Sequence, residues 1–136
     1  MLNRAYLGLF LVLLVVSLGC GSGKVGLTGK VTFSDDNSPI TAGAICFEGS
    51  DGKTGRAEIK PDGTYRAGFD GDGDGLPKGT YKVYLTGVAR VETDATGMNT
   101  SIPIIDPKYS SVVTSGLSFV ADGKVSTYDI SVDRLK

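Results

Sequence analysis

Three aspartates alternate with glycines between residues 70 and 75. Asp70, Asp72 and Asp74 are spaced two apart, and Gly75 stands at the sixth position of the run. Carboxylates at this spacing, followed by a glycine that permits a sharp turn, begin calcium loops of the EF-hand kind. Three carboxylates so close together repel one another, and a divalent cation would offset that repulsion. The segment therefore indicates a calcium site as one interpretation.

The rest of an EF-hand pattern is missing, so a second interpretation stays open. Counted from Asp70, the ninth position is Lys78 and the twelfth is Tyr81, which cannot supply the bidentate carboxylate that closes such a loop. The segment is either a partial calcium site or a soluble, glycine-rich loop whose charges discourage edge-to-edge strand pairing. The carboxylates available to complete a partial site from other loops are Asp62, Glu92 and Asp94.

The composition excludes several other kinds of chemistry. The 136 residues include no histidine, which removes the commonest general base, the usual catalytic zinc ligand and the Ser-His-Asp arrangement. Fourteen Lys and Arg nearly balance 15 Asp and Glu, and such a balance argues against a nucleic-acid partner. We therefore expect no enzyme, no nucleic-acid binding and no cofactor other than calcium in the first interpretation.

The first twenty residues have the pattern of an export signal. Arg4 precedes an uncharged, Leu- and Val-rich run over residues 5–19, which is shorter than the ~20 residues of a membrane-spanning helix. The segment Ser17-Leu18-Gly19-Cys20 resembles a bacterial lipobox, with Ser17 where that motif usually has Leu. The resemblance implies cleavage before Cys20 and acylation of its thiol. The alternative is an ordinary signal peptide that leaves Cys20 free or paired with Cys46.

An acylated Cys20 would determine where the protein resides. Two or more lipid chains anchor a protein stably, so we expect an exported lipoprotein attached to a membrane through palmitate-type chains. By resemblance to bacterial sorting rules, Gly21 in place of an Asp favours the outer membrane. The expected organisation is a signal peptide over residues 1–19, a lipidated tether over residues 20–24 and one domain over residues 25–136.

The elements that would position these residues are short β-strands. Apolar residues alternate with polar ones between turn clusters such as Pro61-Asp62-Gly63, which is typical of antiparallel strands joined by tight turns. The pattern predicts a single all-β domain, a seven-stranded antiparallel Greek-key sandwich of the prealbumin or immunoglobulin kind. The expected strands lie at residues 27–33, 45–47, 56–60, 64–69, 80–86, 117–121 and 127–132.

Residues 87–115 interrupt this rhythm. A loop of this length without structure is unusual in a small domain. It is either an ordered crossover between the sheets, with a strand near residues 101–105, or a binding loop. An exposed edge strand could also pair with a neighbouring chain, although the sequence does not show which strand lies at an edge.

Several short motifs, taken in order, resemble one known family. The longest are Leu27-Thr-Gly-Lys-Val-Thr-Phe33 and Pro77-Lys-Gly-Thr-Tyr-Lys-Val83, and shorter pieces lie at 39–40, 43–47, 62–65, 107–109, 115–117, 122–124 and 128–130. Over residues 25–133 the chain is similar to the carboxypeptidase regulatory-like, or transthyretin-like, domain of small bacterial lipoproteins. The resemblance implies a seven-stranded prealbumin-like sandwich without catalysis. A histidine-dependent hydrolase of the same superfamily is no guide here, because this chain has no histidine.

Together these features predict an envelope-anchored lipoprotein that carries a non-catalytic β-sandwich for binding or structural support. Its expected partners are the membrane, through Cys20, and an envelope protein or glycan. The alternative function is a calcium-assisted carbohydrate- or protein-binding module that uses Asp70, Asp72 and Asp74.

Overall fold

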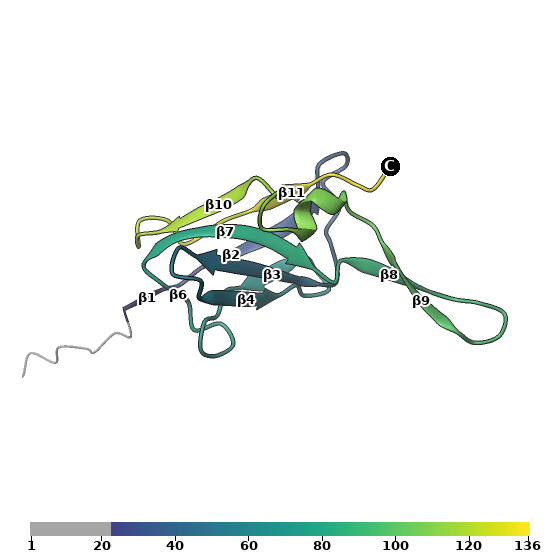
Figure 1. The fold of residues 1–136 in the computed structure, drawn as a ribbon, viewed down its shortest axis with the longest axis horizontal. Coiled ribbons are helices and arrows are strands. Elements are labelled where there is room, and N and C mark those ends of the chain that lie inside the picture. The colour runs from purple at the N-terminus through teal and green to yellow at the C-terminus, as the bar shows by residue number, and fades with distance from the viewer. Residues whose placement is uncertain (1–22) are drawn as a thin grey trace, which may run out of the picture.

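Two β-sheets face each other across a shared apolar core (Figure 1). The computed structural model describes residues 23–136. The expected signal peptide over residues 1–19 and the expected lipid attachment at Cys20 lie outside the described residues. Among the described residues, no helix has the length and apolar character needed to cross a membrane.

The larger sheet has four antiparallel strands. Its order is β10-β7-β3-β4. The bounds are Leu117–Ala121 for β10, Gly79–Thr86 for β7, Ala44–Gly49 for β3 and Thr54–Glu58 for β4. The alternating register turns Ile45 of β3 and its partner Leu85 of β7 to the same face, and both are fully buried. Cys46 therefore points to the opposite face, where it is also buried.

The smaller sheet has the order β11-β2-β5. The bounds are Ile130–Val132 for β11, Thr28–Phe33 for β2 and Thr64–Arg66 for β5. β2 and β5 are antiparallel, but β11 runs parallel to β2. The expectation of an entirely antiparallel sandwich is therefore wrong at β11. The reason is that residues 122–129 carry the chain from β10 in one sheet to β11 in the other, instead of closing a hairpin.

Tyr65 of β5 links the two layers at the centre of the core. Its ring lies 6.2 Å from that of Phe47 in the opposite sheet, and its hydroxyl donates a hydrogen bond to the backbone carbonyl of Tyr128. Burial raises the pKa of the Tyr65 hydroxyl above its ordinary value. Gly29 makes this packing feasible, because a Cβ there would lie 2.8 Å from the Tyr65 ring and still closer to the Tyr128 carbonyl.

The described chain has eleven strands instead of the expected seven. The four additional strands form two small sheets: β1 (Lys24–Val25) pairs with β6 (Leu76–Pro77), and β8 (Ala89–Thr93) pairs with β9 (Asn99–Pro103). The first small sheet places Lys24, expected in the tether, within the folded domain. Two residues per strand are too few to show period-two alternation, so the sequence pattern did not reveal β1 and β6.

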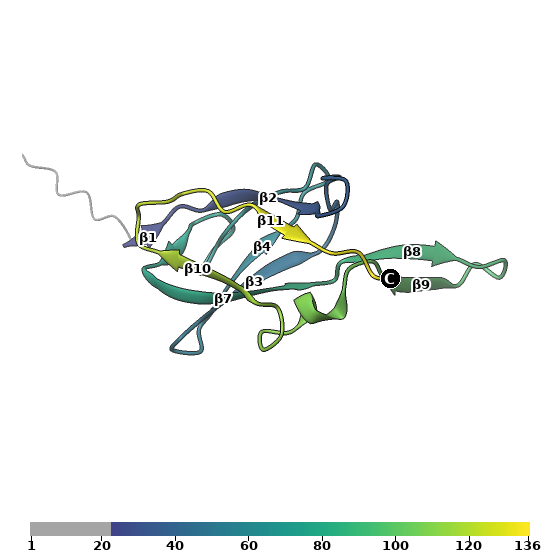
Figure 2. The ribbon, with the colours of Figure 1, turned by 90° about the horizontal axis from the view of Figure 1, so that it is seen from above.

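Residues 87–115 form a projecting hairpin followed by a short helix, and not a simple crossover. The strand expected near residues 101–105 is β9, which ends at Pro103 and begins two residues earlier than expected. We call residues 89–103 the arm, which extends from one end of the sandwich, opposite β1 (Figures 1 and 2). After the arm, the chain returns to the core at Ile105 and again at Tyr109, which belongs to the 3-10 helix Pro107–Ser110.

Candidate functional site

The three predicted ligand residues lie in a tight loop between β5 and β6, which we call the aspartate loop (residues 70–75). Gly75 has a φ of 90°, and a Cβ there would lie 2.5 Å from the backbone carbonyl of Val25, so the loop packs directly against β1. The loop is further fastened by Asp74, whose Oδ1 accepts a hydrogen bond from the amide of Phe69 at 2.7 Å. Its Oδ2 accepts from the amide of Gly71 at 3.1 Å.

A lysine from the start of the domain lies between two of the aspartates. Lys24 Nζ is 2.5 Å from Oδ2 of Asp70 and 2.5 Å from Oδ2 of Asp74, and the lysine side chain is only 12% exposed. The hydrogen bond from Lys24, together with that from the Phe69 amide, lowers the pKa of Asp74 to about 2. The same two carboxylates raise the pKa of Lys24. A cation of the chain itself therefore already offsets the repulsion that calcium would relieve.

The three aspartates do not converge on one point. Asp72 makes no ion pair with Lys24 among the described residues and instead lines an open pocket with Arg56 and Glu58. Within residues 23–136, no group of three Cys, Asp or Glu side chains is arranged to hold a metal ion. Calcium binding by Asp70, Asp72 and Asp74 stays a prediction, and it requires displacement of Lys24.

The residues expected to complete the calcium site are engaged elsewhere. Glu92 and Asp94 belong to the arm, at the end of the molecule away from β1 (Figure 1). The Asp62 carboxylate accepts hydrogen bonds from the amide of Thr64 at 3.0 Å and from its hydroxyl at 2.6 Å. Completion by Glu92 or Asp94 is therefore wrong, because the arm carries both away from the aspartate loop.

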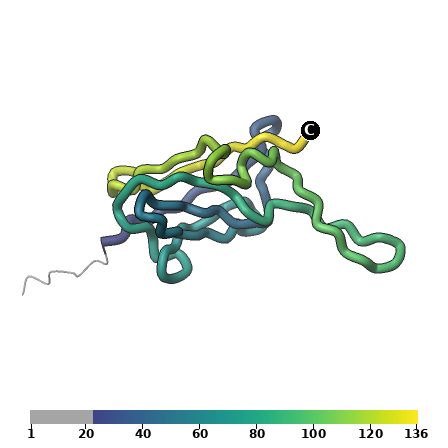
Figure 3. The backbone as a smooth tube through the Cα atoms, in the orientation of Figure 1, coloured from purple at the N-terminus to yellow at the C-terminus, as the bar shows by residue number. Residues whose placement is uncertain are grey.

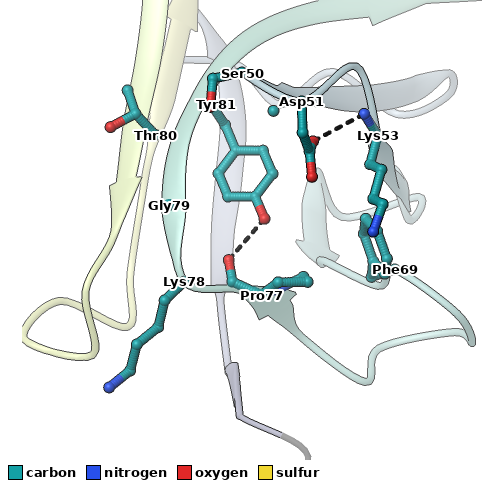
Figure 4. Close-up of a pocket in the computed structure, with 10 residues that line it drawn as sticks. Ser50, Asp51, Lys53, Phe69, Pro77, Lys78, Gly79, Thr80 and Tyr81 are labelled. Atoms are coloured by element: carbon teal, nitrogen blue, oxygen red, sulfur yellow. Dashed lines mark hydrogen bonds between the residues drawn. The ribbon is translucent and has the colours of Figure 1, made fainter.

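A small pocket adjoins the start of β7 (Figure 4). Its volume is about 110 Å³, well below the roughly 300 Å³ at which small-molecule sites begin. The Tyr81 hydroxyl in its wall donates to the carbonyl of Pro77 at 2.6 Å, and Asp51 accepts from the amide of Lys53 at 3.0 Å. These polar groups of the pocket wall are therefore already satisfied within the chain.

The carboxylates of the described residues lack the environment of an acid–base pair. No Asp or Glu within residues 23–136 is buried. Glu58, which shares a pocket with Asp72, is 68% exposed and paired with Arg56 at 3.0 Å. A catalytic carboxylic acid needs burial to keep its proton near neutral pH. These groups are suited to solvation and surface ion pairing.

Polar contacts hold Asp133 and Arg134 against the end of β2 and the 3-10 helix. Asp133 accepts hydrogen bonds from the hydroxyl of Ser34 at 2.6 Å, from Lys108 Nζ at 2.9 Å and from the Tyr109 hydroxyl at 3.1 Å. The bond from Ser34, followed by that from Lys108, lowers the pKa of Asp133 to about 2. Arg134 lies 3.7 Å over the Phe33 ring. The chain end is thereby held against β2 beside the arm.

The arm itself is exposed over most of its length. Val91 is 67% exposed and Met98 is 66% exposed. The arm as a whole projects from the body of the sandwich (Figure 3). At the tip, the Asp94 carboxylate accepts hydrogen bonds from the amides of Thr96 at 2.8 Å and Met98 at 3.0 Å. The hydrogen bond from the Thr96 hydroxyl is the main cause that lowers the pKa of Asp94. The turn is therefore internally satisfied, while the strands are not covered.

Sequence reasoning missed two of these features. Lys24 gave no signal, because its partner Asp74 is 50 residues away and nothing local links them. Arg90, Val91 and Glu92 show a charged–apolar–charged alternation that is visible in the sequence, but both faces of the arm are exposed, so the pattern did not indicate a buried strand.

The fold and these surfaces define the chain as a β-sandwich module. No family model matches it, and no curated protein matches it either. Among solved structures, it resembles a variant of BcpA, the major pilin subunit of Bacillus cereus, at 14% identity and a TM-score of 0.50. That match covers 83% of this chain and 30% of the pilin. At this identity the likeness shows the fold alone.

Two further structures align with lower scores. A DUF3823 family protein from Bacteroides uniformis has 14% identity and a TM-score of 0.44, over 82% of this chain and 43% of that one. A 9R-lipoxygenase from Cyanothece has 17% identity and a TM-score of 0.37, over 82% of this chain and 16% of that one. The chain thus spans less than half the length of each of these proteins.

Proposed function

We propose that this protein is an envelope lipoprotein, anchored by acylation of Cys20, whose transthyretin-like sandwich is a non-catalytic binding or structural module. The observation that carries the proposal is the placement of β1. Its first residue, Lys24, is the fourth after the predicted attachment site, and it is fixed to the aspartate loop by two ion pairs. Four residue steps span at most ~14 Å. An acylated Cys20 would therefore hold the aspartate loop close to the membrane.

This placement gives the two ends of the sandwich different roles. The end with β1 would face the membrane, which we take to be the outer membrane, and the arm at the opposite end would reach an envelope protein or glycan (Figure 2). A rigid scaffold that presents exposed loops is the usual way in which β-sandwiches bind partners. A similar fold occurs in a protein described as a major pilin subunit, which is consistent with a structural role.

The test of anchoring is metabolic labelling with palmitate followed by membrane fractionation. The unsubstituted chain should carry label and sediment with outer-membrane markers, and the Cys20→Ala chain should lose both properties. Cys46→Ala is the matched control, because Cys46 is the buried cysteine of β3 and should not affect labelling. Label that persists in the Cys20→Ala chain would refute the proposal.

A calcium-assisted module is the second candidate. The observation that favours it is that one ammonium group contacts both Asp70 and Asp74 at 2.5 Å, so the two carboxylates are already held near a common cation position. Thermal unfolding in calcium and then in excess chelator tests it. At ~100 times Kd, calcium that binds only the folded chain adds ~2.7 kcal/mol of stability. Asp70→Asn should reduce the gain. If the midpoint of the unsubstituted chain is the same in calcium and in chelator, this candidate is eliminated.

A further inference from the structure

The arm is a two-stranded sheet with little packed against it. Every residue of β8 after Ala89 is exposed, and β9 is exposed except at Ile102. An isolated two-stranded ribbon is only marginally stable in water, and a third strand with which it can pair would stabilise it. The two edges of the arm differ in how readily they can accept such a strand.

The edge formed by β9 is closed at its base. Pro103 has no backbone N–H to donate to a neighbouring strand. Immediately after it, the C-terminal segment runs alongside, where the amide of Leu135 donates to the carbonyl of Ile104 at 3.0 Å and Ile105 bridges to Arg134. An added strand would meet both obstacles on this side.

The edge formed by β8 is open. The amide of Asp94 bonds to the carbonyl of Met98, and the amide of Ile104 bonds to that of Val88, so hydrogen bonds within the hairpin fall on the even-numbered residues of β8. The N–H and C=O groups of Ala89, Val91 and Thr93 therefore point away from β9. Within residues 23–136, no turn or loop backbone group bonds to them.

The sequence of β8 is complementary to itself in one antiparallel register. A two-fold axis at Val91 places each Val91 opposite the other and places Arg90 opposite Glu92 of the second copy, in the close, non-hydrogen-bonded positions. Shifting the axis by one residue would oppose Arg90 with Arg90, or Glu92 with Glu92. The register centred on Val91 is thus the one in which Ala89, Val91 and Thr93 all form hydrogen bonds between the copies, and it is also the one that pairs unlike charges.

The faces of the resulting sheet are also compatible with pairing. All side chains on the face of the arm that carries Val91 are uncharged. The other face carries Arg90 and Glu92, which form an ion pair of 2.8 Å with each other. Charged residues on an edge strand commonly prevent indiscriminate pairing. Here they would reject a strand of different charge pattern and accept a second β8.

We propose that two copies of this chain associate through β8, antiparallel and about a two-fold axis at Val91, so that the two arms form one four-stranded sheet. The contact is isologous and closes after two copies. The arm is at the end of the sandwich opposite β1, so antiparallel pairing leaves both cores undisturbed and places the two β1 ends at opposite ends of the dimer (Figures 1 and 2). The contact therefore joins copies that face each other, and not neighbours anchored side by side in one membrane. The inference goes beyond the proposed function and does not depend on acylation.

Cysteine cross-linking of the purified full chain in detergent tests the register. Val91→Cys should give a disulfide-linked dimer under mild oxidation. Ala89→Cys and Thr93→Cys should each fail alone, because like residues would lie ~14 Å apart in this register, beyond the ~7 Å limit of a disulfide. Co-expressed, those two variants should cross-link to each other. The unsubstituted chain, which retains Cys20 and Cys46, is the background control.

Charge reversal tests complementarity in the purified full chain in detergent. Arg90→Glu and Glu92→Arg should each raise the dimer dissociation constant roughly tenfold, as judged by analytical ultracentrifugation, because both cross-strand pairs become repulsive. The double variant should restore dimerisation. The idea is overturned if the unsubstituted chain stays monomeric, if Thr93→Cys cross-links with itself, or if Val91→Cys gives no disulfide-linked dimer.

Discussion

The aspartate loop and the arm are both polar connections between core strands, yet their charges are used in opposite ways. In the aspartate loop, Asp70 and Asp74 contact Lys24, and Asp74 also binds two backbone amides of its own loop. In the arm, Arg90 and Glu92 have no other ion-pair partner within residues 23–136 and remain more than half exposed. Two of three neighbouring like charges can therefore be neutralised within the fold, whereas an ordinary alternating strand can be the surface that is free to interact.

The largest expected difference is between apolar truncations in the body and in the arm. Leu85→Ala removes a fully buried side chain of β7 and should lower the free energy of unfolding by about 3 kcal/mol. Val91→Ala removes a side chain that is 67% exposed and should change it by less than about 0.5 kcal/mol in dilute solution. Urea unfolding measures both. Equal losses would mean that the arm is part of the cooperative core.

The next effect concerns the lysine that fills the aspartate loop. Lys24→Met leaves Asp70 and Asp74 facing each other without a cation, so the midpoint of thermal unfolding should fall by a few degrees. Lys78→Met, at an exposed lysine of the neighbouring loop, should leave it unchanged. If the loop binds calcium, the Lys24→Met chain should also gain more stability from calcium than the unsubstituted chain. An equal gain would show that Lys24 does not compete for the cation position.

A smaller effect should appear as a dependence on pH. The pKa of Asp74 is about 2 in the folded chain, below the value near 3.9 of a free aspartate. Its interactions therefore stabilise the fold above about pH 4, and this contribution is lost as the pH falls toward 2. Asp74→Asn should reduce the dependence of the free energy of unfolding on pH over this range. Asp72→Asn is the matched change in the same loop, and a similar loss of slope there would contradict the assignment.

The smallest global effect should come from the tip of the arm. Asp94→Ala removes the acceptor for the amides of Thr96 and Met98, so the hairpin should open locally. Amide exchange at Thr100 should become faster, while the urea midpoint of the body stays unchanged. A lower midpoint would show that the arm and the body unfold together.

The sequence predicted the sandwich because its strands have one buried face. Tyr81, Val83 and Leu85 alternate with polar residues, and this pattern is produced directly by the packing of β7 on the core. All seven expected strands correspond to strands of the two main sheets. The arm escaped this reasoning because neither of its faces is buried, so nothing constrains its hydrophobic pattern.

The candidate site was less predictable than the fold. The spacing of Asp70, Asp72 and Asp74 drew attention to a metal, because carboxylate spacing is a local property of the sequence. The Lys24 contact depends on the pairing of β1 with β6, which joins distant parts of the chain. The parallel pairing of β11 with β2 is likewise long-range, and neither can be deduced from residue spacing.

The pairing of β2 with β11 also has a consequence for the order of events during synthesis. The amide of Lys30 bonds to the carboxylate of Asp129, 99 residues further along the chain, and Ile130 pairs with Val31. Contacts of such separation form late and slow folding. The ribosome must therefore make residues 130–132 before the smaller sheet can close, and until then β2 stays without this neighbour. β11 completes the sheet that β2 begins, so about 100 residues must be synthesised between the two halves of one strand pair.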